Sequence, residues 1–173
     1  MTAARERSAA VRRAMTAAEV LTVLEENPRR IAAATANVAA SRLRSVRILG
    51  EWSATDVLAH LRACADARGD FIPKMLAAQR PTLRAVDPRS LIERTNYRAL
   101  EFAPSFRAFG RQRARLLALL TPLPPEGWSR TALVTAGGPV RERTVLHYAQ
   151  WLARHERTHV RHIERVRPAR PSG

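Results

Sequence analysis

Apolar residues recur at helical spacing along most of the chain, and polar residues mark where each helix begins. The clearest example is GEWSATDVLAHL, in which Ser53 and Asp56 have the spacing of a capping box. The stripe that follows indicates one buried helix face; its members are Val57, Leu58, Leu61, Cys64 and Ala65. Gly69 and Pro73 predict that this helix kinks or ends before Gln79.

Two helices are predicted before this one, with a boundary at Pro28. Thr16 and Glu19 have capping-box spacing and begin the first helix, which Pro28 ends. Asn27 is a suitable N-cap for the second helix, because Pro28 then occupies the first helical position, where its missing N–H costs nothing. The apolar face of this second helix consists of Ile31, Ala34 and Val38.

In the second half of the chain, the pattern of apolar and polar residues predicts a crossing loop at 80–88, a short helix at 90–100 and a longer helix that begins at Pro104. Residues 121–143 form a long Pro/Gly-rich loop with up to two short β-like pieces. Thr144 then caps a helix that reaches about Val166. Four long helices, extra short ones and no convincing sheet predict an all-α fold, a four-helix bundle.

The chain of 173 residues suits one domain. Residues 1–15 carry four arginines and almost no large apolar side chain, so they are expected to form a disordered arm. Met15 is a second possible start, which leaves open whether residues 1–14 belong to the native protein. The bundle is expected at 16–167, and residues 168–173 are a short tail.

Cysteine content and charge limit the compartment and the class of partner that the sequence predicts. The single cysteine cannot form an internal disulfide, and no apolar run has the length of a membrane span, so a soluble, cytoplasmic protein is expected. The net charge is +15, but thirty basic residues are dispersed along the chain, and all except Lys74 are arginine. No basic helix carries interleaved aromatic residues, so nucleic-acid binding is disfavoured.

Four of the five histidines lie in the last predicted helix, and the stretch HERTH separates two of them by four residues. On a helix His155 and His159 lie about 40° apart, so their imidazoles can converge on one point. His60 lies in the helix after Ser53, and a bundle brings such faces together. Three neutral imidazoles suit zinc, nickel, copper or ferrous iron and leave a position open for water or substrate.

Each candidate also has a purely structural interpretation. A lone His60 on an apolar stripe fits a satisfied core histidine, and the pair in HERTH fits an exposed pair on an arginine-rich helix. Cys64 is a candidate nucleophile or fourth ligand, although a small buried hydrophobe is the simpler interpretation. His147 and His162 are expected as outer contacts of the site or as surface groups. Packing is the expected role of Trp52, Trp128 and Trp151.

HERTH also matches the HExxH pattern of zinc metalloproteases, in which Glu156 would be the general base. That mechanism needs a third ligand beyond the pair and usually a strand that binds the substrate. His162 is too close for the extended form of the motif, and Glu164 is too close for a carboxylate ligand from another helix. No substrate-binding strand precedes the motif, so the sequence disfavours a protease.

Two stretches together resemble the DinB-like (YfiT-like) superfamily of metal enzymes. They are EWSATDVLAHL, with its Trp-Ser helix start leading to a histidine, and GGPVRERTVLHYAQWLARHERTHVRHIERV, with a histidine pair at i, i+4. The resemblance covers roughly residues 28–166. It implies a bundle in up-down-down-up order, with a long crossing between the second and third main helices.

The resemblance also implies a divalent metal, zinc or nickel, held by His60, His155 and His159. Members of the family include transferases and isomerases that use low-molecular-weight thiols such as bacillithiol or mycothiol, and dimers are common. The expected cofactors are therefore a divalent metal and such a thiol. The expected partners are a small-molecule substrate and a second copy of the chain.

Cys64, His162, Glu156 and Arg154 are the expected neighbours of the metal or the pocket. Arginines surround the histidine pair on the last helix, and if any of them faces the pocket, an anionic substrate fits better than a neutral one. The sequence thus favours a metal-dependent transferase, isomerase or hydrolase. The alternative is a non-catalytic DinB-like binding or stress-response module with a basic surface.

Overall fold

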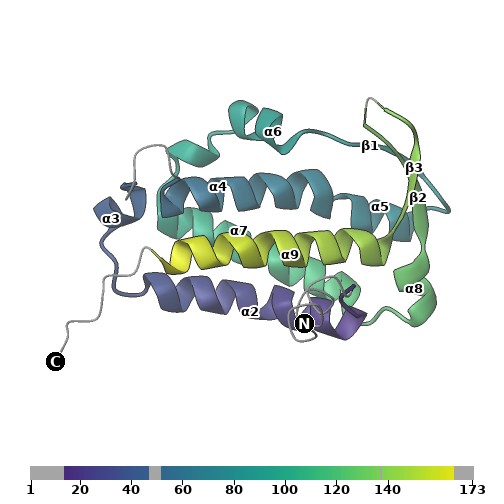
Figure 1. Cartoon of the computed structure of the whole chain (residues 1–173), viewed down its shortest axis with the longest axis horizontal. Coiled ribbons are helices and arrows are strands. Elements are labelled where there is room, and N and C mark those ends of the chain that lie inside the picture. The colour runs from purple at the N-terminus through teal and green to yellow at the C-terminus, as the bar shows by residue number, and fades with distance from the viewer. Residues whose placement is uncertain (1–13, 47–51, 137, 166–173) are drawn as a thin grey trace, which may run out of the picture.

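The computed structural model describes residues 14–46, 52–136 and 138–165. Most of the predicted arm and the whole of the predicted tail lie outside these residues. The chain forms an elongated bundle of helices, and a small sheet covers one end of it (Figure 1). None of the helices in the described part combines the length and the apolar character needed to cross a membrane.

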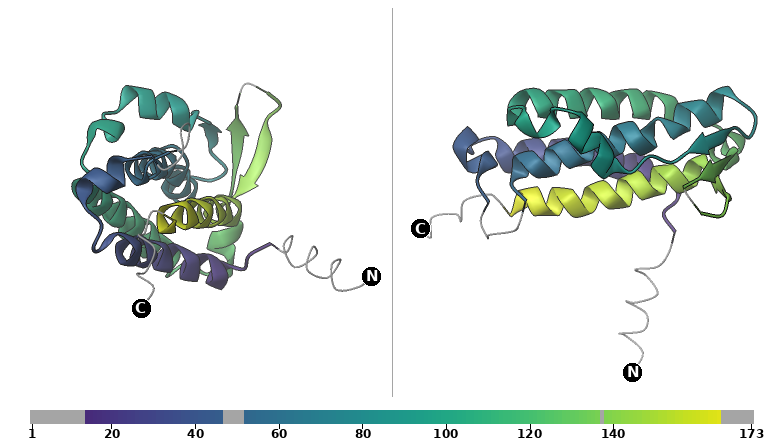
Figure 2. Two further views of the ribbon diagram at one scale, coloured as in Figure 1. Left: turned by 60° about the vertical axis from the view of Figure 1, so that its left-hand side comes forward. Right: turned by 90° about the horizontal axis from the view of Figure 1, so that it is seen from above.

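Four long helices build the bundle: α2 (Ala17–Thr35), α4 (Ala54–Cys64), α7 (Phe102–Leu120) and α9 (Val145–Glu164). Helices α2 and α9 are neighbours and run in the same direction, because Asn27 contacts Glu156 and Arg30 contacts Glu164. Helix α4 also packs on α9 but runs the opposite way (Figure 2).

Helix α7 packs on α4 and α2 and runs in the same direction as α4. Arg62 near the end of α4 donates to Ser105 near the start of α7. Asp66, beyond the end of α4, accepts from Gln112 further along α7. The order of the four helices is therefore up-down-down-up, which confirms the predicted fold.

In the described part of the chain, six short helical segments connect the long ones. The α-helical segments are α3 (Ala40–Arg44), α5 (Phe71–Ala77), α6 (Pro88–Arg94) and α8 (Pro125–Ser129). A π-helical turn, η1 (Ala65–Gly69), joins α4 to α5 where the sequence predicts a kink, and a 3-10 turn, η2 (Tyr97–Ala99), precedes α7. The long crossing between the second and third main helices thus contains α5, β1, α6 and η2.

The sheet has three short strands, β1 (Thr82–Arg84), β2 (Thr131–Thr135) and β3 (Arg141–Thr144). Strand β2 pairs parallel with β1 and antiparallel with β3. Strands β2 and β3 confirm the two β-like pieces expected before the last helix, whereas β1 replaces part of the predicted crossing loop. Leu83 of β1 is buried in register with Val134 of β2, so a contact distant in sequence creates this strand.

The predicted helix starts are confirmed at three places. Thr16 and Glu19 exchange the two hydrogen bonds of a capping box, and Ser53 and Asp56 do the same at the start of α4. Thr144 accepts a hydrogen bond from the backbone of His147 at the start of α9. These side chains satisfy amide groups that the first helical turn leaves unpaired.

The predicted boundary at Pro28 is wrong, because α2 is one continuous helix with Pro28 inside it. A proline inside a helix costs about 3 kcal/mol. The buried positions nevertheless continue across it at helical spacing; they are Val20, Leu24, Asn27, Ile31 and Ala34. Packing of this whole stripe against the bundle outweighs the local cost. Asn27 is not a cap, since its side chain donates to Glu156 across the core.

An ion pair lies at the centre of the bundle. Arg113 of α7 and Glu156 of α9 are both 2% exposed, and their Nε and Oε1 atoms are 3.1 Å apart. The two atoms are not aligned for a hydrogen bond, so the contact is coulombic. Burial raises the pKa of Glu156, while the charge of Arg113 and the hydrogen bond from Asn27 oppose that shift. Three of the four long helices thus meet at Glu156.

We expect the substitution Glu156→Gln to destabilise the fold by about 3–5 kcal/mol, because it leaves the buried charge of Arg113 without a counterion. The free energy of unfolding in urea is the measurement. Glu25→Gln is the matched control, since Glu25 pairs with Arg29 on the surface of α2 and such pairs contribute about 0–1 kcal/mol. Equal losses in the two variants would contradict a central role for the buried pair.

Candidate metal centre

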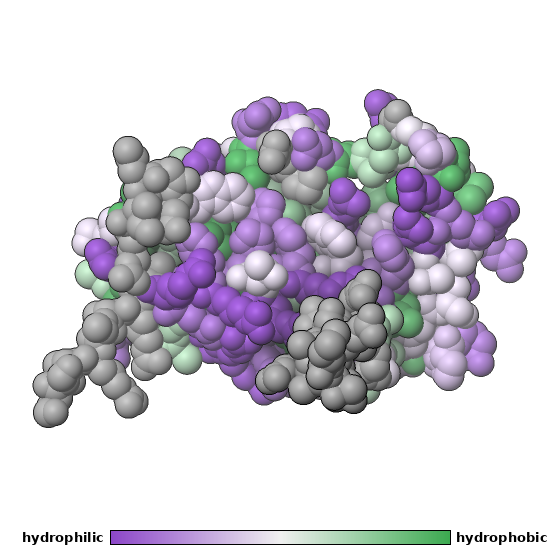
Figure 3. All heavy atoms as spheres, viewed as in Figure 1, coloured by the Kyte–Doolittle hydropathy of each residue, from purple (hydrophilic) through white to green (hydrophobic). Residues whose placement is uncertain are grey.

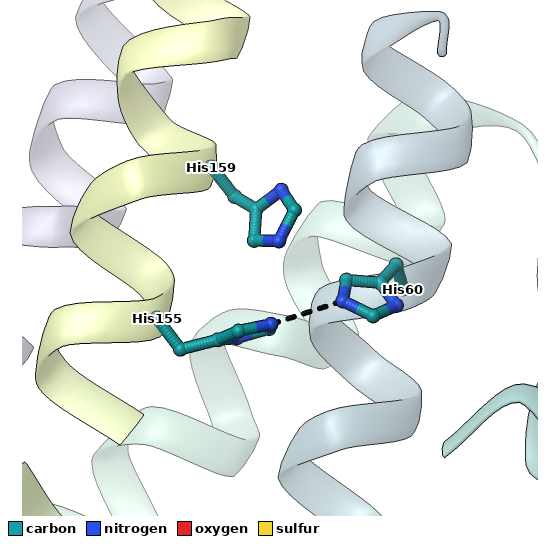
Figure 4. A group of neighbouring side chains, drawn as sticks. All are labelled: His60, His155 and His159. Carbon is teal, nitrogen blue, oxygen red and sulfur yellow. Dashed lines mark hydrogen bonds between the residues drawn. The ribbon is translucent and has the colours of Figure 1, made fainter. Parts of the chain in front are cut away.

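Three histidines converge in the space between α4 and α9 (Figure 4). His60 lies in the second half of α4, while His155 and His159 lie one turn apart on α9. The two helices run antiparallel with these positions at the same level, so all three rings point toward one another. The four-residue spacing of the α9 pair places both side chains on the face that packs against α4.

The distances between the rings are short. The Nε2 atoms of His60 and His155 are 3.0 Å apart, and one nitrogen from each of the three rings lies within 4.8 Å of the others. Zinc–nitrogen bonds of about 2.05 Å in a tetrahedral site separate the ligand atoms by about 3.3 Å. Small rotations of the side chains are therefore sufficient to bring the three nitrogens to one metal ion.

Burial keeps two of these imidazoles uncharged. Desolvation, with smaller contributions from the neighbouring His159 and His60, lowers the pKa of His155 to about 3. Desolvation likewise lowers the pKa of His159 to about 4, with smaller contributions from His60 and His162. Both rings therefore offer a lone pair at neutral pH. A half-buried cluster of neutral ring nitrogens is a donor set that fits a divalent transition metal.

Two tryptophans flank the cluster. Trp151 stacks on His155 with ring centroids 4.6 Å apart and an angle of 13° between the planes. Trp52 stacks on His159 at 6.1 Å and meets the edge of His60 at 5.0 Å. These contacts hold the imidazole planes from outside. Trp52 is 41% exposed, so its packing role is at the edge of the histidine cluster and not in the core, whereas Trp128 is buried in the core.

Cys64 touches the cluster from the next turn of α4. Its Sγ atom lies 3.5 Å from Nε2 of His60 and 4.0 Å from Nε2 of His155. Burial raises the pKa of this thiol to about 12, although Arg68 opposes the shift. In the metal-free protein the thiol is therefore protonated and is not an activated nucleophile. It is also buried, as the simpler sequence interpretation expects.

The other predicted neighbours divide into two groups. His162 lies at the edge of the site, where its Nε2 is 2.9 Å from the backbone oxygen of Trp52. Glu156 is not brought to the cluster, because it contacts Arg113 and Asn27 in the core. A general base of the HExxH type is therefore not available beside the histidine pair, which agrees with the sequence argument against a protease.

The arginines that surround the histidine pair in sequence do not converge on it. Arg154 and Arg161 are exposed. Burial lowers the pKa of His147, and the charge of Arg154 adds to that shift after the charge of Arg143. Arg157 lines a different pocket, together with Met15 and Glu19 of the N-terminal region. Any preference for an anionic substrate must therefore come from other residues.

Arg68 is a residue near the cluster that the sequence argument missed. Its guanidinium carbon lies 5.3 Å from the ring centroid of Trp151, and its charge contributes to the lowered pKa of His155. Arg68 follows Cys64 by four residues, in the π-helical turn η1 that continues from α4. This spacing was the signal in the sequence that could have identified it. The π-helical turn at 65–69 is a local widening of the helix of a kind that recurs at functional sites.

Comparison with curated proteins gives no match to this chain. Among solved structures, YfiT from Bacillus subtilis, described as a probable metal-dependent hydrolase with an unusual four-helix bundle topology, superposes with a TM-score of 0.70 at 19% identity. The alignment covers 90% of this chain and 89% of YfiT. These values show that the two proteins share a fold.

The mycothiol-dependent maleylpyruvate isomerase superposes with a TM-score of 0.64 at 14% identity, over 84% of this chain and 60% of the isomerase. The alignment thus covers three fifths of that enzyme, which is less than two thirds. The sequence model of the DinB superfamily matches residues 23–163, which include both histidine-bearing helices. The chain belongs to the DinB superfamily.

Proposed function

We propose that this protein is a metal-dependent enzyme that holds zinc or nickel through His60, His155 and His159 and acts on a small molecule. The observation that carries the proposal is the convergence of three ring nitrogens, from two segments distant in sequence, within 4.8 Å. The similarity of the fold to a probable metal-dependent hydrolase and to an isomerase supports it.

A divalent metal in this site supplies Lewis acidity toward a bound water, thiol or carbonyl. The residues of the chain prepare the site for that chemistry. Burial keeps His155 and His159 deprotonated, and the flanking indoles of Trp52 and Trp151 fix the ring planes. Three protein ligands leave one coordination position open, and the half-buried state of the rings leaves access for a small ligand.

The reaction we propose is a thiol transfer, an isomerisation or a hydrolysis. One structural neighbour is named as mycothiol-dependent, and this name supports the choice of a low-molecular-weight thiol as a co-substrate to test. Homodimer formation, which the family resemblance implies, stays a prediction. Arg154, His162 and Cys64 are not proposed as metal ligands, because the cluster consists of three histidines.

The first test is metal content. Substitution of His155 by alanine removes one of three ligands, so we expect zinc affinity to fall by about a hundredfold or more, beyond the loss typical of outer contacts. The measurement is competition with a chromophoric chelator, using protein purified without a histidine tag. His147→Ala is the matched control, since His147 lies on the same helix but outside the cluster. Undiminished affinity in His155→Ala would show that the ligand set is wrong.

The second test asks whether the bound metal has a free coordination position, as in a catalytic site, or is held by a fourth protein ligand, as in a structural site. With cobalt in place of zinc, we expect no sulfur-to-cobalt charge-transfer band, because the proposed ligand set consists of three ring nitrogens and no sulfur. Cys64→Ser is then expected to leave the visible cobalt spectrum unchanged. A near-ultraviolet band that disappears in Cys64→Ser would instead identify a fourth protein ligand. Such a closed site would oppose a catalytic role.

The third test is turnover. Protein loaded with zinc or nickel is assayed with a panel of thiols and electrophiles, and product is measured by mass spectrometry. We expect a thiol-dependent or hydrolytic product that is lost by at least about tenfold in His159→Ala, in line with loss of a group that acts on the reacting atoms. Metal binding without product formation across the panel would favour the alternative, a non-catalytic DinB-like module.

A further inference from the structure

A cavity of about 380 Å³ lies beside the histidine cluster, between the π-helical turn η1, the β2–β3 hairpin and the first turns of α9. Trp151 is shared by the two sites, because it lines the cavity and also stacks on His155. The volume is in the range of sites for small organic ligands. Figure 3 shows hydrophilic side chains on the surface over β3 and the adjoining part of α9.

The polar lining of this cavity is cationic. Three arginines contribute to the wall, Arg68 from η1 and Arg141 and Arg143 from β3, together with His147 and Tyr148 from α9. No aspartate or glutamate is among the residues that line it in the described part of the chain. A concave surface with one sign of charge concentrates ligands of the opposite sign, because the low-dielectric walls focus the field.

Arg68 lies at the boundary between the cavity and the histidine cluster, where its guanidinium is placed to bind an anionic ligand. The indole of Trp151 lies under its guanidinium at 5.3 Å, which orients the planar group. Its Nε atom is buried and makes no hydrogen bond within the described residues. A guanidinium that is fixed on one face and has an unused buried donor is suited to a carboxylate or phosphate oxygen.

Tyr148 provides a second recognition group in the cavity wall. It is 3% exposed, and its ring packs edge to face on Phe71 at 5.1 Å and on His147 at 5.5 Å. These contacts fix the ring, so the hydroxyl donor is preorganised. Burial raises the pKa of Tyr148, and the positive charges of Arg68 and Arg143 oppose that shift. Burial lowers the pKa of His147, and the same two charges add to that shift.

The remaining lining is apolar and includes Ala85, Val134 and Pro139. Cationic groups at one wall and apolar groups at another match a ligand with an acidic head and a short hydrocarbon or aromatic body. We propose that this cavity binds a small organic anion, recognised through a carboxylate or phosphate by Arg68, Arg143 and Tyr148. The anion is the substrate or co-substrate of the metal-dependent reaction, so this assignment rests on the proposed function.

The test uses the full-length, metal-free protein, so that binding to a metal does not contribute. Succinate, inorganic phosphate and the neutral succinamide are titrated separately, and the side-chain resonances of isotope-labelled histidine are followed by NMR. We expect a saturable shift of the His147 resonance with an anion and none with succinamide. Saturation by succinate identifies a carboxylate as the ligand group, and saturation by phosphate identifies a phosphate.

Substitution identifies the residues that bind the anion. In Arg68→Gln the dissociation constant is expected to rise about tenfold or more, as for loss of a charge-assisted hydrogen bond. Tyr148→Phe keeps the ring packing and removes only the hydroxyl, and we expect a smaller rise. Arg157→Gln is the control, because it removes the same charge from α9 on the side that faces Met15 and Glu19. It is expected to bind as the unmodified protein does.

Three results would overturn the proposal: no saturable shift with either anion, an equal shift with succinamide, or equal dissociation constants in Arg68→Gln and Arg157→Gln. If Arg68→Gln does not fold, Tyr148→Phe decides, and unchanged binding there is the contrary result. The outcome is independent of the metal test. Absent anion binding with intact zinc binding refutes the cavity assignment alone, whereas undiminished zinc binding in His155→Ala with intact anion binding refutes the metal site alone.

Discussion

The rotation of α9 about its own axis is the constraint on which the site depends. One side of this helix carries Glu156, which contacts Arg113 of α7 and Asn27 of α2 in the core. An adjacent face carries His155 and His159, about 100° and 60° around the helix axis from Glu156, and these two side chains meet α4. Because neighbouring residues on a helix differ by about 100° in direction, fixing Glu156 inward fixes where His155 points. The buried ion pair thereby positions the cluster without touching it.

Charge links the histidine cluster to the adjoining cavity. Three neutral imidazole ligands offset none of the charge of a divalent ion, and the cluster of proposed ligands contains no carboxylate or thiolate. Arg68 lies close enough to act on His155, His147 and Tyr148 together. A metal in this site would therefore keep its full charge beside a cationic wall. An anionic ligand, or hydroxide, is the species that such a region stabilises most.

The sequence predicted the features that depend on interactions within one helix, namely helix starts and side chains that share a helix face. The capping boxes at Thr16 and Ser53 form, and the four-residue spacing of the α9 histidines places both on one face. The errors arise where distant packing outweighs local preference. Pro28 stays inside α2 because the buried stripe on either side of it is continuous. Strand β1 exists only because β2 lies beside it.

The residues next to the histidine pair in the sequence are not the ones that surround the site in the structure. The arginines next to the histidine pair point elsewhere, while Arg68 and Trp52 come from a different helix and from the segment before it. The same reasoning explains why the glutamate of HERTH does not lie beside the histidine pair, as the HExxH mechanism requires. The i, i+4 spacing alone aligns two imidazoles, but the role of the glutamate between them depends on what its side of the helix packs against. In this bundle that partner is Arg113, and Glu156 serves the core.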